Sequence, residues 1–306
     1  MTTTVTYHPA TRLHDQGPGH PECPERVDAV LDSLHGPALG DAIRWVEARP
    51  ADRRVLERVH PPAYLDLLER LDRSGGAALD GDTYLGVRTW EAALASAGAA
   101  LAAVEEAMRG GSAFAVTRPP GHHAMAGRAM GFCFLNNVSL AVRHAQSKGI
   151  QRALIVDWDV HHGNGTQAIF EADPSVRFVS MHQYPWYPGT GAADERGVGN
   201  VFNVPRPPGL PRASYARDLL AAVDQAIAGW TPDAWFISAG FDSLAGDPLG
   251  GFTLEPEDMA GWVMAFRQRA DGRPLVAVLE GGYRLERLAA GVVATVRALA
   301  ASGIPD

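Results

Sequence analysis

From residue 113 onward, the chain repeats one pattern, a short apolar run that ends in a cluster of polar residues. The runs are 113–116, 153–156, 176–181, 234–237 and 275–279, and the polar clusters that follow them are 117–123, 157–165, 182–184, 238–242 and 280–283. Short apolar runs of this kind are typical of strands buried on both faces. Amphipathic helical patterns separate the runs, for example at Phe134, Val138 and Val142. Strands that alternate with helices predict an α/β fold, with a mainly parallel central sheet flanked by helices on both faces.

The domain organisation follows from the same alternation. No linker, repeat or low-complexity segment interrupts it, and the 306 residues suffice for one large α/β core. We therefore expect a single domain over residues 1–306.

The N-terminal region contains a loop, 14–26, that is rich in Gly, Pro, His and charged residues. Because it is so polar, we expect this loop to lie outside the core. Pro24 suits the first turn of a helix, which would carry Val27 and Leu31 on its apolar face and end before Gly36.

The composition limits the possible partners and compartments. The net charge of −8 gives no reason to expect nucleic acid as a partner, and it suits cationic ligands. The most apolar stretch, 92–104, is too short to span a bilayer, so we expect no membrane segment. Two cysteines, Cys23 and Cys133, cannot form a disulfide framework, and the first five residues lack the features of a signal peptide. These features favour the cytoplasm.

The run at 153–157 leads directly into two acids and a histidine. In an extended chain, side chains two residues apart share a face, so Asp157, Asp159 and His161 are expected to point the same way. Burying two carboxylates and an imidazole at the end of a strand is costly unless something binds them. A divalent metal ion is the simplest such partner.

Ligands bind beyond the carboxyl ends of the strands in open parallel sheets, where all the polar clusters of this chain fall. Three oxygen or nitrogen ligands with an open fourth position describe a catalytic zinc site. Asp159 and His161 are spaced to bind together. Asp242, at the end of another strand, is the best third ligand, and Asp157 is the alternative, because one acid of such a series often orients a histidine instead.

Three further residues supply the groups that metal-assisted amide hydrolysis requires. His122 and His123 follow a rigid Pro-Pro-Gly turn and suit general acid and base work. Tyr283 follows two glycines, so its hydroxyl could donate to a developing oxyanion.

At these positions the sequence resembles the zinc-dependent histone deacetylase superfamily, which also contains acetylpolyamine amidohydrolases. The motifs that carry the resemblance are RPPGHH at 118–123, GFCFLNN at 131–137, DWDVHHGNGTQ at 157–167, SAGFD at 238–242 and EGGY at 280–283. They occur in order within a match that runs from about His8 to Tyr283. With Trp158 and with Asn164 in place of a second aspartate, the chain looks like a bacterial, class II-like member.

The resemblance implies the three-layer arginase/deacetylase fold and one catalytic zinc ion held by Asp159, His161 and Asp242. It implies that His123 is the general base, that His122 is electrostatic or the general acid, and that Tyr283 polarises the acyl carbonyl. Asp157 would pair with His122 and help to hold a structural potassium ion.

The resemblance also assigns residues that bind the substrate. Phe132, beside Gly131, and Tyr187 match the aromatic pair that walls an acyl-lysine tunnel, and Thr83 lies where relatives contact the substrate backbone. Leu249 occupies the position at which polyamine-specific eukaryotic relatives place a glutamate. Because a leucine cannot select a cationic chain, Leu249 favours acyl-lysine or another neutral-necked substrate.

The sequence therefore predicts a zinc-dependent amidohydrolase that removes acetyl or other acyl groups from Nε-acyl-lysine in a peptide or protein. Acetylpolyamine or another small acylated amine is the alternative substrate on the same fold. A catalytically silent binder of acyl-lysine is an alternative of another class, and it would be expected to have lost Tyr283 or a metal ligand. Binuclear arginase-like chemistry would require more aspartates than the central motif contains, because His162 and Asn164 occupy the neighbouring positions. The oligomeric state stays open.

Overall fold

A computed structural model describes residues 2–37 and 39–301 of the chain. Eight parallel strands form the central sheet, in the order β2-β1-β5-β10-β9-β6-β7-β8. They are β1 (Thr3–Tyr7), β2 (Ile43–Glu47), β5 (Ser112–Ala115), β6 (Ala153–Asp157), β7 (Val176–Gln183), β8 (Val201–Arg206), β9 (Ala234–Ala239) and β10 (Leu275–Leu279). All five apolar runs are strands of this sheet, which confirms the predicted α/β class.

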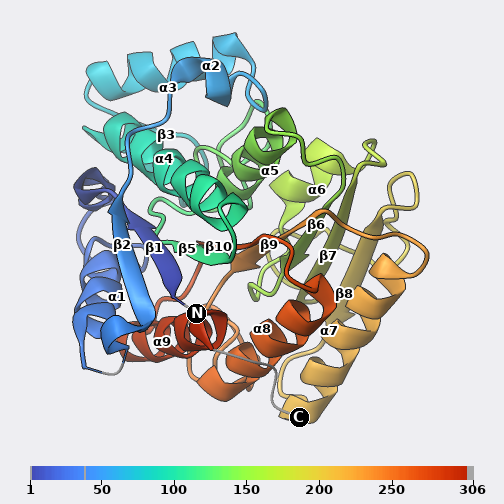
Figure 1. The fold of residues 1–306 in the computed structure, drawn as a ribbon. Helices are drawn as coiled ribbons and strands as arrows, with labels where there is room; N and C mark the ends of the chain where they lie inside the picture. The colour runs from blue at the N-terminus through green and yellow to red at the C-terminus, as the bar shows by residue number, and fades with distance from the viewer. Residues whose placement is uncertain (1, 38, 302–306) are drawn as a thin grey trace.

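Helices cover both faces of the sheet and make three layers (Figure 1). The first face carries α2 (Arg53–Leu56), α3 (Pro62–Arg73), α4 (Thr89–Met108), α5 (Asn137–Ser147) and α6 (Asn164–Phe170). The opposite face carries α1 (Glu25–His35), α7 (Arg212–Ile227), α8 (Pro256–Ala270) and α9 (Leu285–Ala300). A separate antiparallel pair, β3 (Ala77–Ala78) and β4 (Tyr84–Leu85), lies beside α3 and α4.

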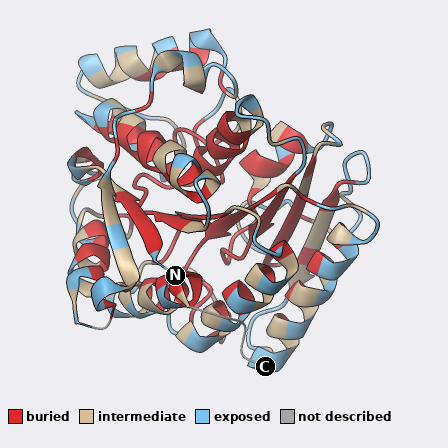
Figure 2. Ribbon diagram, in the orientation of Figure 1, coloured by how far each residue is buried: buried red, intermediate tan, exposed pale blue. Residues whose placement is uncertain are grey.

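The core is divided into two halves by the sheet, and β6 serves both. Leu154 and Val156 belong to the cluster formed with α1, α7, α8 and α9, whereas Ala153 and Ile155 belong to the cluster formed with α4 and α5. The central strands β10, β9 and β6 are accordingly buried along their whole length, whereas the edge strands β2 and β8 are partly exposed (Figure 2). This arrangement explains why the apolar runs are continuous and do not alternate with polar residues.

The N-terminal loop differs in part from the expectation, because three of its residues enter the core while the others stay at least partly exposed. Its residues His14, Glu22 and Arg26 are all 0% exposed. The Glu22 carboxylate accepts hydrogen bonds from Arg26 Nη1 at 3.0 Å and from Arg118 Nε at 2.7 Å. For these three residues the prediction was wrong. The negative charge of Glu22 is neutralised by Arg118, which lies 96 residues further along the chain than Glu22 and is not apparent from the loop sequence.

Arg26 also connects this loop to the carboxyl end of β10. Its Nε donates to the carbonyl oxygen of Gly282 at 2.7 Å, and its Nη2 donates to that of Glu280 at 2.6 Å. The buried ion network formed by Glu22, Arg26 and Arg118 therefore supports the edge of the sheet where the polar clusters gather. Within the described residues, no helix is long and apolar enough to cross a membrane.

We expect Glu22→Gln to lower the free energy of unfolding at pH 7 by about 3 kcal/mol, because it leaves two buried guanidinium groups without a counter-charge. Burial by itself would raise the pKa of Glu22, but Arg118 and Arg26 outweigh it and lower that pKa to about 2. The stabilisation is therefore present above pH 4.5 and is lost as the pH falls toward 2. Urea unfolding measures the difference in the free energy of unfolding between the wild type and Glu22→Gln. We expect this difference to become smaller as the pH falls toward 2.

Glu57→Gln is the matched control for this measurement, because Glu57 forms an exposed pair with Arg53 on the surface. Surface pairs contribute little, so its unfolding curve should stay close to that of the wild type. Equal shifts for the two variants would contradict the structural importance of the buried network.

Candidate active site

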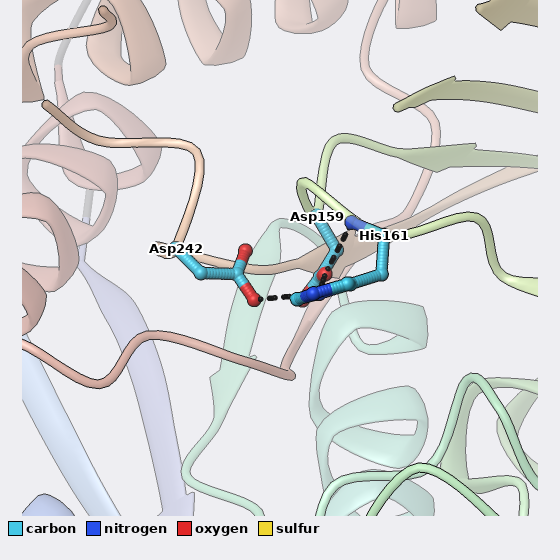
Figure 3. Close-up of side chains that lie close together, drawn as sticks. All are labelled: Asp159, His161 and Asp242. Atoms are coloured by element: carbon cyan, nitrogen blue, oxygen red, sulfur yellow. Dashed lines mark hydrogen bonds and ion pairs between the residues drawn. The ribbon is translucent and has the colours of Figure 1, made fainter. Parts of the chain in front are cut away.

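Asp159, His161 and Asp242 meet beyond the carboxyl ends of the neighbouring strands β6 and β9 (Figure 3). Their ligand atoms lie within 4.8 Å of one another. The Nδ1 atom of His161 is 3.1 Å from Asp159 Oδ1 and 3.2 Å from Asp242 Oδ2. All three residues are buried. Two carboxylates and one imidazole are a donor set that fits a divalent metal ion such as zinc.

The electrostatics of Asp242 agree with this fit. Burial, together with the charge of Asp159, raises the pKa of Asp242 to about 7. An ionised carboxylate is thus costly at this position unless a positive charge lies nearby. A bound cation would supply that charge.

The local backbone brings Asp159 and His161 together in a way that the extended-chain argument did not foresee. Strand β6 ends at Asp157, and the chain then turns. The amide of Asp159 donates to Asp157 Oδ1 at 3.1 Å, and the amide of His161 donates to Asp159 Oδ1 at 2.9 Å. Each carboxylate thus caps the amide two residues later, which is an Asx-type turn. Asp159 and His161 lie close to Asp242, whereas Asp157 Oδ2 lies 3.0 Å from His122 Nδ1.

Two glycines make room for the carboxylates. A Cβ atom on Gly240 would lie 2.1 Å from Asp159 Oδ2, and one on Gly281 would lie 2.2 Å from Asp242 Oδ2. The amide of Gly281 also donates to Asp159 Oδ2 at 2.9 Å. Glycine is required here because the backbone approaches the acids closely.

His122 and His123 lie next to this group, with ring centroids 4.0 Å apart. The Nδ1 atom of His122 is 3.0 Å from Asp157 Oδ2, so Asp157 lies beside His122 and outside the three-residue metal group. The Nδ1 atom of His123 is 2.8 Å from the side-chain oxygen of Asn164. Because an amide oxygen only accepts, we assign the Nδ1 proton to His123, which leaves its Nε2 free to accept one.

The two histidines have opposite pKa shifts. Burial by itself would lower the pKa of His122, but the carboxylates of Asp159 and Asp157 outweigh it and raise the pKa to about 10. Burial lowers the pKa of His123, and the neighbouring His122 and His161 lower it further, to well below its usual value. The two shifts therefore act in the directions that a paired acid and base require.

Glu280 is a site residue that the sequence reasoning did not assign. It is buried, and its Oε2 accepts hydrogen bonds from the amides of Gly121 at 2.7 Å and His122 at 3.1 Å. The carboxylate thereby fixes the turn that presents the two histidines. Its position directly after the apolar run of β10 was a usable signal, because polar residues that follow β6 and β9 in the same way, Asp159 and Asp242, also lie in the site.

Aromatic rings lie close to the group formed by Asp159, His161 and Asp242, with the Tyr187 and His161 ring centroids 6.2 Å apart. The Tyr187 ring lies edge-on to His123, with centroids 5.2 Å apart, and Phe132 lies edge-on to the half-buried Tyr283 at 5.8 Å. A Cβ atom on Gly131 would lie 2.4 Å from the His123 ring. Burial raises the pKa of Tyr283 well above its usual value, so its hydroxyl stays protonated and can donate.

Leu249 and Thr83 have different surroundings. Leu249 is partly buried, and its carbonyl oxygen accepts from Trp186 Nε1 at 3.0 Å, next to Tyr187 in the chain. Thr83 is only 1% exposed, and its hydroxyl accepts from the amide of Phe132 at 3.0 Å. In the structure, Thr83 therefore supports the aromatic wall, and its contact with a substrate stays a prediction.

We expect the wild-type protein to retain about one zinc ion per chain after loading and dialysis. Asp242→Asn should retain less than about a tenth of that amount, because an amide is a poor metal ligand. Asp173→Asn is the control, since Asp173 binds Ser175 and Arg143 instead. Metal analysis by mass spectrometry measures the content, and equal retention by both variants would contradict this metal site.

Comparisons with known proteins show the family of this chain. The histone deacetylase domain model matches residues 20–299. A probable deacetylase of Methanothermobacter thermautotrophicus is 38% identical over 302 residues, which cover 96% of this chain and 90% of the relative. The polyamine deacetylase HDAC10 of Mus musculus is 39% identical over all of this chain, which spans 49% of that protein.

The crystal structure of the HDA15 HD domain has a TM-score of 0.94 with this structure at 34% identity, and the match covers 98% of this chain and 88% of that one. A domain match of this length, together with the relatives, shows the family. It also supports a deacetylase or amidohydrolase activity. The chain belongs to the histone deacetylase family and has its arginase/deacetylase fold.

Proposed function

We propose that the chain is a zinc-dependent amidohydrolase that removes acetyl or other acyl groups from Nε-acyl-lysine. The observation that carries the proposal is the geometry of the site, in which His122 and His123, with ring centroids 4.0 Å apart, lie beside Asp159, His161 and Asp242. When bound by these three residues, zinc would supply Lewis acidity toward the acyl carbonyl and the attacking water.

The histidine pair moves the protons of hydrolysis. The free Nε2 of His123 accepts a proton from the water that attacks the carbonyl carbon. The charged His122, held by Asp157, stabilises the negative charge that develops and provides a proton for the leaving nitrogen. The C–N bond then breaks, its electron pair remains on nitrogen, and the products are a carboxylate and a free amine.

Tyr283 acts on the other side of the acyl group. Its protonated hydroxyl donates to the carbonyl oxygen as that oxygen becomes negative. Phe132 and Tyr187 would pack against the methylene arm of the substrate, with Gly131, Thr83 and Leu249 completing the binding region. Asp157 would help to hold a structural potassium ion, a role that its complete burial supports.

The proposal treats residues 1–306 as one catalytic domain that works in the cytoplasm. One sheet joins strands from Thr3 to Leu279, and both cysteines are unpaired. Both features suit a single domain in a reducing compartment.

A small acylated amine is the second candidate substrate. The similarity to a polyamine deacetylase favours it, whereas Leu249 lacks the charge that would select a cationic arm. The ratio of kcat/KM for an acetyl-lysine peptide to that for acetylated putrescine and spermidine decides between the two classes.

We expect the protein to hydrolyse a fluorogenic acetyl-lysine peptide and to lose at least about 90% of this turnover in a strong chelator. Turnover should return when zinc is added back. Release of acetate, measured separately, controls for effects on the fluorogenic reporter. Turnover that persists after metal removal would contradict the proposed mechanism.

We expect Tyr283→Phe to lower kcat by about 10²–10³-fold with little change in KM, because a single donor to the developing oxyanion is removed. Tyr7→Phe is the control, since Tyr7 lies at the end of β1, with Arg12 over its ring, and β1 is separated from β10 by β5. Steady-state kinetics on the same peptide measure both variants. An unchanged kcat in Tyr283→Phe would exclude this role.

A further inference from the structure

Asp247 connects two segments of the chain, one at Leu249 and one at Tyr283. It follows Asp242 in the chain and is 6% exposed. Its Oδ2 accepts hydrogen bonds from the amides of Tyr283 at 2.7 Å and Arg284 at 3.2 Å. Its Oδ1 accepts from the amide of Leu249 at 2.9 Å. One buried carboxylate therefore holds both the backbone of the proposed oxyanion donor and the segment that borders the substrate.

We infer that Asp247 is a positioning residue. It holds Tyr283 where its hydroxyl can donate to the acyl carbonyl, and it holds the segment 247–249, called the rim below, through the amide of Leu249. The inference rests on the proposed function for its catalytic part, and on the hydrogen bonds alone for its structural part.

Tyr283 needs such an anchor because the residue before it provides little stiffness. Gly282 has a φ of 122°, which only glycine adopts readily. The carbonyl of Gly282 is held by Arg26, whose guanidinium carbon also lies 5.1 Å from the centre of the Tyr283 ring. Arg26 and Asp247 thus hold the Gly282–Tyr283 backbone at its carbonyl and its amide. Oxyanion donors must be placed to within about 0.5 Å, so this backbone position decides how well the hydroxyl works.

The second oxygen of Asp247 extends the connection to the rim. The amide of Leu249 donates to Asp247, and the carbonyl oxygen of Leu249 accepts from the indole of Trp186. Trp186 precedes Tyr187, whose ring lies against His123. Asp247 therefore links the backbone of Tyr283 to Leu249, and Leu249 links Asp247 to Trp186, which is next to Tyr187 in the chain.

The chemistry of the three partners explains why an aspartate is needed. All of them are backbone N–H donors, and an ionised carboxylate only accepts. An asparagine of the same shape would turn its NH₂ group toward at least one of these donors and lose that bond. Asp247→Asn is therefore a small change in size that breaks at least one arm of the connection.

Asp233→Asn is the matched control. The Asp233 carboxylate likewise accepts from two backbone amides, those of Gln151 at 3.1 Å and Arg152 at 2.8 Å. It precedes β9 and binds the segment before β6, so it lies at the opposite edge of the sheet from the site.

The first measurement is amide hydrogen exchange of the full-length protein. In Asp247→Asn, we expect exchange to rise by at least about threefold in peptides covering 245–251 or 281–285, while Asp233→Asn raises it only near 151–152. Unchanged exchange in both the 245–251 and the 281–285 peptides would overturn the inference, whatever the activity of the protein.

The second measurement is a double-mutant cycle with Tyr283→Phe on the acetyl-lysine peptide, using single-turnover conditions for slow variants. We expect Asp247→Asn to lower kcat about tenfold or more in the wild type, and less than about twofold when Tyr283 is already Phe. A purely structural role would lower both by the same factor, and that result would overturn the inference.

Asp247→Glu keeps an acceptor-only group and serves if Asp247→Asn does not fold. We expect a smaller loss of kcat that again depends on Tyr283, and a loss independent of Tyr283 would count against the inference. Absence of turnover in the wild type would contradict the proposed function alone, because the exchange measurement still decides the link between Asp247 and Tyr283.

Discussion

The burial of negative charge at the carboxyl edge of the sheet is the constraint on which the structure depends. Asp157, Asp159, Asp242 and Glu280 are all 0% exposed, and ionised carboxylates in such surroundings are expensive unless they are paired. The protein compensates Asp157 with His122 and gives Glu280 the amides of Gly121 and His122. The carboxylates of Asp159 and Asp242 both lie next to Nδ1 of His161, and a cation bound by these three residues would offset the negative charge.

The same rule explains the layer behind the site. Glu22, Arg26 and Arg118 are buried together, and two of Arg26's donors are used on backbone carbonyls at the end of β10. Burying these charged groups costs desolvation free energy. In return, Arg26 holds the carbonyl oxygens of Glu280 and Gly282 in the glycine-rich segment before Tyr283. Flexible glycines that let the backbone approach the acids are thus restrained by side chains from distant parts of the chain.

The sequence allowed the fold class to be predicted because each strand has its own apolar run and each helix its own periodicity. It also indicated which side chains collect at one edge, since polar residues follow the runs of β5, β6, β9 and β10. The prediction for the loop at 14–26 was wrong for its buried residues, because the loop sequence does not show that Glu22 pairs with Arg118. It also missed Glu280, although that residue directly follows a buried strand, and the turn that begins at Asp157.

Local hydrophobic periodicity depends on residues close in the chain, so the sequence by itself determined the strands, the helices and the edge at which function gathers. The strand order β5-β10-β9-β6 was decided only by tertiary packing, and it brings His122, Asp159, Asp242 and Tyr283 together. The pairing of buried charges was decided in the same way, as in Glu22 with Arg118 and Asp247 with the amide of Tyr283. These choices join residues far apart in the chain, and their energies depend on burial and on partners that no local pattern records.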